Sequence, residues 1–293
     1  MIFLVDASVY VFRAYYSMPP DMRDGDGQPV NALYGFARFL GDLLERARPE
    51  HAALAFDESL TTSFRNAIYP AYKQNRDPAP PELKRQFALC RELCRLLGVA
   101  EFGSPTHEAD DIIGTLATRL RAAGHRAVVV TRDKDLAQLI SDGDHYWDYA
   151  GERRFAYADI EAAFGVRPER MADFLALTGD TVDNIPGVPG VGPKTAAALL
   201  TAFASLEEIY AGLDRISALP VRGAAKLAAK LALHREAAYF ARSLTVIACD
   251  MPFEFSLEML RRRKPDLAAL DAFYDRHRFG QALRRQAERL AGH

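Results

Sequence analysis

Three short apolar runs, each followed closely by aspartate, constrain the fold of this chain most. The runs cover residues 2–5, 52–56 and 127–130. Short continuous apolar runs bounded by polar residues are typical of strands that are buried on both faces of a parallel sheet. Helical patterns separate the runs, at residues 31–47, 82–97, 109–123 and 134–141. Because strands and helices alternate, we predict an α/β core built on a mostly parallel sheet.

Helical periodicity replaces the strand pattern in the second half. Residues 144–155 predict a β-hairpin with Ala150 and Gly151 at its turn. Helices are then expected at residues 157–164, 168–177, 193–203, 224–231, 235–247 and 266–289. We therefore expect a core at residues 1–155, which includes a basic segment at about 60–90, and a helical subdomain at residues 156–293.

Composition excludes several classes of protein. The chain has 293 residues, with 37 Lys and Arg against 39 Asp and Glu. This balance argues against a simple nucleic-acid coat protein, which needs a basic surplus, but a nuclease with a carboxylate-rich site remains open. Three cysteines give no disulfide framework and suggest a reducing cytoplasm; Cys90 and Cys94 fit buried thiols better than a zinc pair. We expect no signal peptide and no membrane span.

Aspartates follow all three predicted strands. Asp6 and Asp57 follow the first two, and Asp133 and Asp135 follow the third. The carboxyl ends of parallel strands share one edge of a sheet, where α/β folds bind ligands. Further acids that can join them are Glu108, Asp110, Asp111, Asp180 and Asp183. Hard divalent cations, Mg²⁺ or Mn²⁺, prefer such oxygen ligands, and two of them suit phosphodiester hydrolysis.

Helix capping is the competing explanation for several of these acids. Taken singly, Glu108, Asp110, Asp111, Asp133 and Asp135 fit caps or helix-dipole partners. Asp6 and Asp57 could likewise be solvated loop acids. Three strands that end in aspartate at one sheet edge are hard to obtain from capping alone, so the pattern favours a metal site.

Two segments outside the core suit nucleic acid. Residues 60–81 interleave cations and aromatic rings, among them Arg65, Tyr72, Lys73 and Arg76, a composition that fits a single strand passing near the metals. Residues 184–195 read NIPGVPGVGPKT and place Gly187, Gly190, Gly192 and Lys194 before a helix. Glycines that let backbone amides approach a phosphate predict a helix-hairpin-helix clamp on DNA. A solvated loop and a plain turn between helices are the alternatives.

Five motifs, in order along the chain, closely resemble those of the 5′-to-3′ exonuclease domain of bacterial DNA polymerase I and the wider flap endonuclease family. They are FLVDASVYVFRAYYS, FDESLTTSFRNAIYPAYKQNR, HEADDIIGTLA, TRDKDLAQLI and FLALTGDTVDNIPGVPGVGPKTAAALL. The resemblance implies a PIN-like core, an arch at about residues 60–90, a helix-hairpin-helix of the H3TH type at about 184–203, and a free-standing nuclease. It implies two-metal cleavage of DNA at 5′ ends, flaps and branched duplexes.

The resemblance also assigns residue roles. One metal is expected at Asp6, Asp57, Glu108, Asp110 and Asp111, and the other at Asp133, Asp135, Asp180 and Asp183. Lys73 and Arg76, with Asp110, are the expected catalytic residues. Arg65, Tyr72 and Arg13 are expected beside them on the DNA. The glycine-rich hairpin, through Gly187, Gly190, Gly192 and Lys194, is expected to bind DNA and a monovalent cation, usually K⁺.

Two other functions remain as alternatives. One is a PIN-type ribonuclease, which the glycine-rich duplex clamp disfavours. The other is a non-catalytic DNA-binding factor, which gains nothing from carboxylates that repel phosphate. We therefore expect a monomeric, cytoplasmic repair and replication nuclease that works at the bacterial nucleoid, with a separate DNA polymerase or ligase as a pathway partner.

Overall fold

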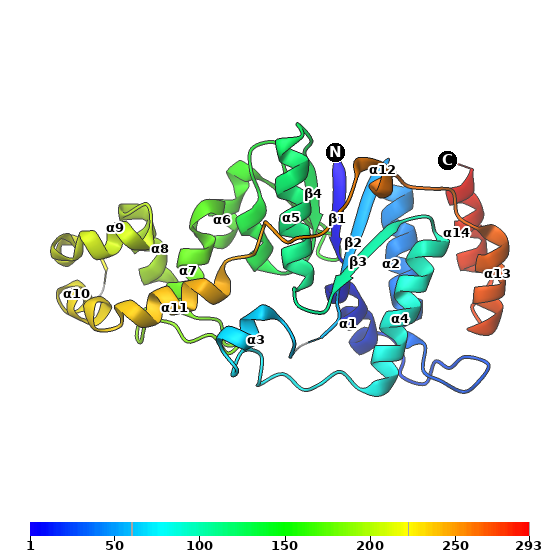
Figure 1. Ribbon diagram of the computed structural model, residues 1–293, viewed down its shortest axis with the longest axis horizontal. Coiled ribbons are helices and arrows are strands. Elements are labelled where there is room, and N and C mark those ends of the chain that lie inside the picture. The colour runs from blue at the N-terminus through cyan, green and yellow to red at the C-terminus, as the bar shows by residue number, and fades with distance from the viewer. Residues whose placement is uncertain (60, 222, 293) are drawn as a thin grey trace.

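A six-stranded sheet forms the centre of the protein, as seen in a computed structural model (Figure 1). The structure describes residues 1–59, 61–221 and 223–292, so the first residue of the expected arch and the last of the helical subdomain lie outside it. The strands lie in the order β3-β2-β1-β4-β5-β6. The first five are parallel and β6 is antiparallel. Their bounds are β1 Ile2–Asp6, β2 His51–Asp57, β3 Ala100–Ser104, β4 Ala127–Val130, β5 His145–Asp148 and β6 Arg153–Ala156.

Helices cover both faces of the sheet because successive side chains of a strand point to opposite sides. On β1, Ile2 and Leu4 join the apolar cluster that contains α5 (Ala109–Ala122). Phe3 and Val5 join the other cluster, in which α1, α2 and α4 take part. These three helices are Ala7–Ser17, Asn31–Ala47 and Pro81–Leu96. The short helix α3 (Phe64–Ile68) and an irregular stretch join β2 to α4.

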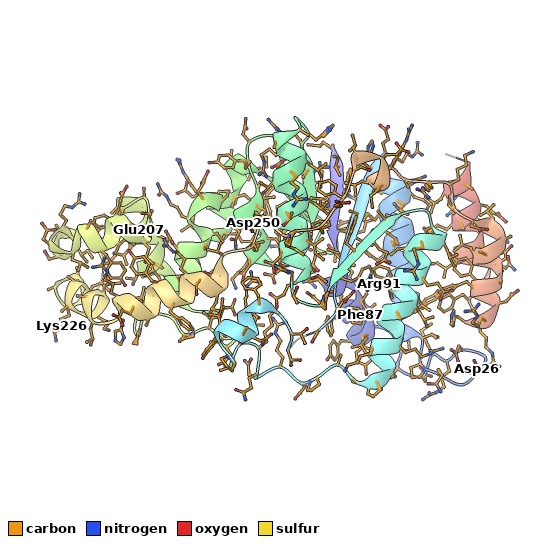
Figure 2. The ribbon with its side chains drawn as sticks, viewed as in Figure 1. Asp26, Phe87, Arg91, Glu207, Lys226 and Asp250 are labelled. Atoms are coloured by element: carbon orange, nitrogen blue, oxygen red, sulfur yellow. The ribbon has the colours of Figure 1, made fainter. Side chains whose placement is uncertain are left out.

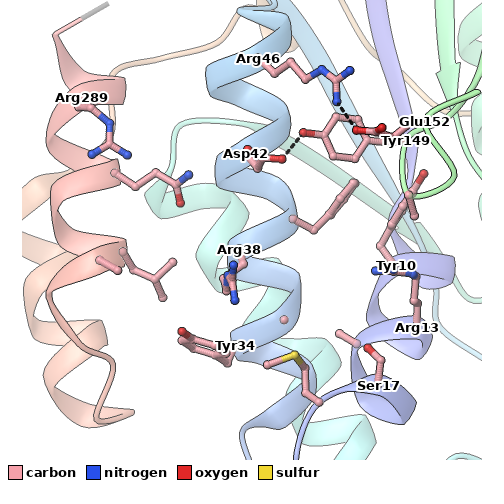
Figure 3. A pocket seen from close by; sticks show the side chains of 18 residues that line it. Tyr10, Arg13, Ser17, Tyr34, Arg38, Asp42, Arg46, Tyr149, Glu152 and Arg289 are labelled. Atoms are coloured by element: carbon pink, nitrogen blue, oxygen red, sulfur yellow. Dashed lines mark hydrogen bonds and ion pairs between the residues drawn. The ribbon is translucent and has the colours of Figure 1, made fainter. Parts of the chain in front are cut away.

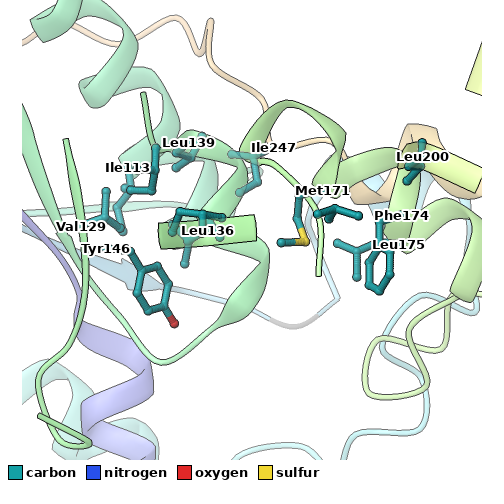
Figure 4. Close-up of a cluster of buried hydrophobic side chains, with 14 of the residues drawn as sticks. Ile113, Val129, Leu136, Leu139, Tyr146, Met171, Phe174, Leu175, Leu200 and Ile247 are labelled. Atoms are coloured by element: carbon teal, nitrogen blue, oxygen red, sulfur yellow. The ribbon is translucent and has the colours of Figure 1, made fainter. Parts of the chain in front are cut away.

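A helical part extends from the β6 side of the core. It contains α6 Ile160–Phe164, α7 Met171–Thr178, α8 Pro193–Ala202, α9 Leu206–Ala211, α10 Ala224–Leu233 and α11 Arg235–Thr245. Its apolar core is continuous with that of the sheet. Figure 4 shows Leu136 and Met171 lying between Val129 of β4 and Leu200 of α8. The helical part is therefore packed against the sheet and not joined to it by a bare linker.

After α11 the chain returns to the core. It passes α12 (Leu257–Leu260) and ends in α13 (Leu267–Arg276) and α14 (Gln281–Ala291). Leu270 and Phe273 of α13 and Leu283 of α14 join the cluster that holds α2 and α4. The division at residue 155 stays a prediction, but the last two helices lie on the sheet side of the molecule (Figure 1). None of the described helices is long and apolar enough to cross a membrane.

Most elements match the expectation from sequence. All three predicted strands, the hairpin and the mostly parallel α/β architecture are confirmed. The single helix expected at residues 266–289 is wrong, because the chain breaks at residues 277–280, where Arg278 has φ 55°. Residues 134–139 form a 3-10 helix, η1, which is narrower than the α-helix expected there. The strand β3 was not anticipated, since its five residues, AEFGS, include few β-formers.

The glycine that follows α4, Gly98, lets the segment at Arg263 pack closely against the end of α4. Gly98 has φ +74°, and a Cβ there would lie 2.3 Å from the carbonyl oxygen of Arg263. Arg263 N also donates to Gly98 O at 2.8 Å. Gly124, which follows α5, has φ +84° with nothing within 4 Å of a Cβ.

We expect Gly98→Ala to lower the free energy of unfolding by about 3 kcal/mol, from left-handed strain plus overpacking. Gly124→Ala carries the strain alone and should cost about 1 kcal/mol. Chemical denaturation of both variants measures the difference. Equal losses of free energy in the two variants would mean that the segment at Arg263 moves aside without cost.

Candidate metal and nucleic-acid site

Aspartates from neighbouring strands meet at the carboxyl edge of the sheet. Asp6 ends β1, and its carboxylate accepts hydrogen bonds from Val9 N at 3.4 Å and Thr131 Oγ1 at 2.8 Å. Asp57 ends the adjacent strand β2 and accepts from Ala109 N at 2.9 Å, which ties it to the start of α5. The α5 segment that begins with Glu108 and Asp110 therefore lies over the ends of β1 and β2.

A second group of acids lies beside the first. Asp133 N donates to Thr131 Oγ1 at 2.9 Å, and Asp133 caps η1 by accepting from Asp135 N at 2.9 Å. Asp180 comes from the loop after α7, where its Oδ1 accepts from Val182 N at 2.8 Å and Asp183 N at 3.3 Å. Asp133 therefore caps η1, as expected, and also lies in the acid cluster.

Burial and mutual repulsion raise the pKa values of several of these carboxylates. Burial raises the pKa of Asp6 to about 8, and the negative charges of Asp57 and Asp133 add to the rise. Burial, followed by Asp133, Asp6 and Asp57, raises the pKa of Asp110 well above its usual range. Burial and Asp133 raise the pKa of Asp135 to about 8. Such a cluster is not stable when fully ionised unless cations compensate it.

The donor set fits divalent cations. Asp135 Oδ1 is buried and accepts no hydrogen bond, and the nearest ammonium, that of Lys134, lies 3.7 Å away. The remaining donors are also carboxylate oxygens, which Mg²⁺ and Mn²⁺ prefer. Within the described ranges, however, no three His, Cys, Asp or Glu side chains stand ready to hold a metal ion together.

Lysine and arginine side chains of the protein pair with several of these carboxylates. Lys73 Nζ lies 2.6 Å from Glu108 Oε1 and 3.7 Å from Asp183 Oδ2. Arg76 forms a short ion pair with Asp183, and Lys134 Nζ lies 3.1 Å from Asp180 Oδ2. Burial by itself would lower the pKa of Lys73, but Glu108 and Asp183 raise it. Lysine and arginine side chains therefore neutralise part of the cluster.

Asp111 is engaged differently from the other acids. Its side chain is fully buried and takes two hydrogen bonds of 2.8 Å from the Arg65 guanidinium. Burial alone would raise the pKa of Asp111, but the hydrogen bonds and charge of Arg65 lower it. Its oxygens also accept from the backbone N–H groups of Glu108 and Ala248. The structure thus places Asp111 beside the cluster, with both oxygens already bonded.

The short helix α3 and the residues after it, 64–76, are what we call the arch base. Its end is hydrogen-bonded to the loop that carries Asp180 and Asp183. Lys73 N donates to Asp183 O at 3.0 Å, and Asn75 Nδ2 donates to Thr181 O at 2.8 Å. The Tyr72 hydroxyl donates to Glu108 at 3.0 Å and to Asp183 at 3.1 Å, so it bridges the two groups of acids.

A cavity of about 790 Å³ opens beside Asp57, between the arch base and α4. Its lining includes Lys73, Arg76 and Lys84. Phe87 and Arg91 of α4, marked in Figure 2, line the same cavity. Cations and a ring beside the acids suit a nucleic-acid strand.

The glycine-rich hairpin joins α7 to α8. A Cβ on Gly187 would lie 2.3 Å from Gly179 N, so the two backbone segments can approach this closely only with glycine. Gly192 caps α8 without a side chain, and Lys194 is exposed in the first turn. Gly190 has φ +77°, and a Cβ there would lie 2.5 Å from Lys230 Nζ of α10. The helix-hairpin-helix expected here is present, with a second lysine beside it.

Arg13 lines a different groove from the cavity beside Asp57. It is exposed on α1 and lines a groove of about 890 Å³ (Figure 3). Arg38 and Arg46 of α2 and Arg289 of α14 line the same groove. Two of these arginines are paired, Arg46 with Glu152 and Arg289 with Glu45. Figure 2 places Lys226, in the helical part, and Asp26, in the core, at opposite ends of the molecule.

Sequence reasoning missed three residues of the site. Thr131 is buried and links Asp6 to Asp133. Ser8 Oγ accepts from Asp57 N at 2.8 Å, and Lys134 pairs with Asp180. Thr131 and Lys134 stand inside the TRDKD motif, so their place next to the aspartates was the available signal.

Comparisons with known proteins agree with this architecture. Two family models match, that of the 5′-3′ exonuclease N-terminal resolvase-like domain at residues 1–165 and that of the 5′-3′ exonuclease C-terminal SAM fold at residues 166–268. The 5′-3′ exonuclease of Aquifex aeolicus is 34% identical, over 92% of this chain and 89% of its own length. DNA polymerase I of Rhizobium leguminosarum is 37% identical over 98% of this chain. The chain spans only 28% of that polymerase.

A solved structure shares the fold. It is a bacteriophage T5 flap endonuclease variant in a pseudo-enzyme-product complex with DNA and metal ions, with a TM-score of 0.66 and 19% identity over 100% of this chain and 99% of its own. Together, the comparisons identify a nuclease, and hence a hydrolase. Within that class, this chain belongs to the 5′-3′ exonuclease family.

The raised pKa values predict how stability depends on pH. Between about pH 3.8 and pH 8 the unfolded chain releases the protons of Asp6 and Asp135 while the folded chain keeps them. The free energy of unfolding of the metal-free protein should therefore fall as the pH rises through this window. Thermal melts in EDTA measure the slope. Saturating Mg²⁺ should flatten it, and Asp135→Asn should make it shallower; a slope that is the same in all three samples would contradict the cluster.

Proposed function

We propose that the protein is a structure-selective 5′ nuclease that hydrolyses DNA phosphodiester bonds at 5′ ends, flaps and branched duplexes by a two-metal mechanism. The observation that carries the proposal is the buried, mutually repelling acid cluster between a cationic arch base and a helix-hairpin-helix. Its membership of the 5′-3′ exonuclease family supports the same reaction.

Two sets of acids would hold the cations, Mg²⁺ or Mn²⁺. Asp6, Asp57, Glu108 and Asp110 would hold one, and Asp133, Asp135, Asp180 and Asp183 the other. When bound, the cations supply an activated water and neutralise charge that develops on the phosphate. Asp111 was expected in the first set, and its bonds to Arg65 suit an indirect role better.

The arch base supplies the protein's own positive charge. Lys73 and Arg76 are paired with Glu108 and Asp183, two of the acids assigned to the cations. Once those carboxylates are neutralised, both side chains are free to face the scissile phosphate in the adjoining cavity. Tyr72, which donates to Glu108 and Asp183, holds the two carboxylates in register with each other.

DNA would contact the protein on both sides of the acids. Gly187, Gly190, Gly192 and Lys194 would grip the backbone of a duplex without reading its sequence, with K⁺ bound by hairpin carbonyls. Arg13 would meet phosphates along its arginine-lined groove. We further propose that the protein acts as a monomer at the bacterial nucleoid in the cytoplasm, in repair and replication, beside a separate DNA polymerase or ligase.

Cleavage of a 5′-labelled flap tests the reaction. We expect Mg²⁺-dependent cutting near the junction, none in EDTA, and little on an intact single strand. Asp110→Asn should lower the rate by more than the roughly 10–100-fold that loss of an outer-shell partner costs. Asp142→Asn, an exposed acid before β5 at the other sheet edge, is the matched control. Binding without cutting in any divalent ion would favour the non-catalytic alternative, and preferred cutting of a matched RNA flap would favour a ribonuclease.

The hairpin makes a separate prediction. Lys194→Ala should weaken binding of duplex DNA of any sequence and lower the slope of log affinity against log salt by about 0.9, because one phosphate contact is lost. Fluorescence anisotropy from low to high salt measures it. Lys264→Ala, a surface lysine far along the chain from the hairpin, should leave the slope unchanged; an equal change in both variants would exclude a hairpin clamp.

A further inference from the structure

The buried ion pair of Arg65 and Asp111 joins three segments that are distant in sequence. Arg65 belongs to the arch base and Asp111 to the first turn of α5, which also carries Asp110. The side chains of the pair are at most 3% exposed. Arg65 also donates through Nε to Leu244 O at 2.9 Å and through Nη2 to Val246 O at 2.8 Å. No direct contact with substrate is needed to explain why both charges are buried together.

The third segment is the return strap, which we define as residues 244–253 and which begins in the last turn of α11. It leads from α11 back along α5 to the core (Figure 1). Asp111 Oδ1 accepts from Ala248 N at 2.9 Å. Gln138 of η1 adds two bonds, from its Nε2 to Thr245 O at 3.1 Å and from Ile247 N to its Oε1 at 3.0 Å. Gly114 of α5 gives the strap room, because a Cβ there would lie 2.7 Å from Ile247 Cγ2.

The strap contacts α7 and the loop that leads into the hairpin. Thr245 Oγ1 donates to Ala172 O of α7 at 3.0 Å. Ala241 and Leu244 of α11 pack with Ala176 of α7 and Ile185 of the loop that leads into the hairpin. The strap therefore connects α5, which carries Asp110, to α7 and the loop before the hairpin.

We infer that the Arg65–Asp111 pair is a positioning device that sets the separation between the hairpin and the acids held by the sheet and α5, and so fixes where the strand is cut. The inference rests on the proposed function. The hairpin would hold the duplex and these acids would mark the reacting phosphate, so the distance between them would set the number of nucleotides that separate the two. Asp111 acts through Arg65 and the strap and is not a ligand of the cations.

Two neighbouring aspartates of α5 give a matched test. Asp111→Asn keeps the side-chain shape but leaves the Arg65 guanidinium without its bidentate partner. We expect its products from a 5′-labelled flap to spread over adjacent positions where the wild type gives one dominant length. Because Arg65 also contacts Glu108, the variant's affinity for Mn²⁺ without DNA, measured calorimetrically, should fall by no more than the roughly 10–100-fold that loss of an outer-shell partner costs. Asp110→Asn should show the reverse, with Mn²⁺ affinity reduced more than about 100-fold and any residual cut at the wild-type position.

Gln138→Ala supplies a second variant that alters no charge. It removes two bonds to the strap and leaves every carboxylate in place. We expect a smaller spread of product lengths and faster amide hydrogen exchange at residues 244–248, the same direction as in Asp111→Asn. If Asp111→Asn does not fold, this variant carries the test.

The outcomes separate the inference from the function on which it rests. A wild-type protein that binds the flap and never cuts it overturns the proposed function. A wild type that cuts at one position, with both variants keeping that position despite a loosened strap, overturns the inference alone. Loss of Mn²⁺ affinity in Asp111→Asn to the extent seen in Asp110→Asn would make Asp111 a cation ligand and also overturn it.

Discussion

Repulsion among clustered carboxylates is the constraint on which the rest of the structure depends. At a single sheet edge, burial and the negative charges of Asp57 and Asp133 raise the pKa values of Asp6 and Asp110. An unfolded chain escapes this repulsion, so the fold has to compensate for it. Lys73, Arg76 and Lys134 approach the acids from two different loops, and Thr131 and Ser8 bind the backbone and side chains around them.

This compensation links parts of the chain that hydrophobic packing alone would leave separate. The arch base is held to the loop after α7 by a backbone bond at Lys73 and a side-chain amide bond from Asn75, as well as by its charges. The loop in turn carries Asp180 and Asp183 and leads into the glycine-rich hairpin. One set of contacts therefore determines the electrostatics of the sheet edge, the shape of the cavity beside Asp57 and the placement of the hairpin.

Sequence patterns predicted the parts of this arrangement that depend on local rules. Apolar runs ending in aspartate predicted β1, β2 and β4, and the shared edge followed from parallel pairing. The glycines predicted the hairpin because Gly190 takes a positive φ and Gly187 leaves no room for a Cβ beside Gly179. The break between α13 and α14 was missed, since Arg278 takes a left-handed conformation that the apolar pattern does not signal.

The engagement of individual side chains could not be predicted in the same way. Asp110 and Asp111 are adjacent and identical in type, yet one faces the acid cluster and the other binds Arg65. Adjacent positions on a helix point about 100° apart, and only the position of the distant Arg65 and Ala248 decides which acid meets a partner. Those contacts span more than 40 and more than 130 residues along the chain.

The path of the chain after α11 has a topological consequence. The helical part leaves the core after β6 and rejoins it through the strap, α12, α13 and α14, so it is an insertion with two covalent attachments. An insertion that is attached at both ends cannot rotate about a single linker. The folded core already holds its two ends together, so closing this loop costs no further conformational entropy. A protease cut in the strap would leave both fragments associated through their shared apolar core while converting the double attachment into a hinge.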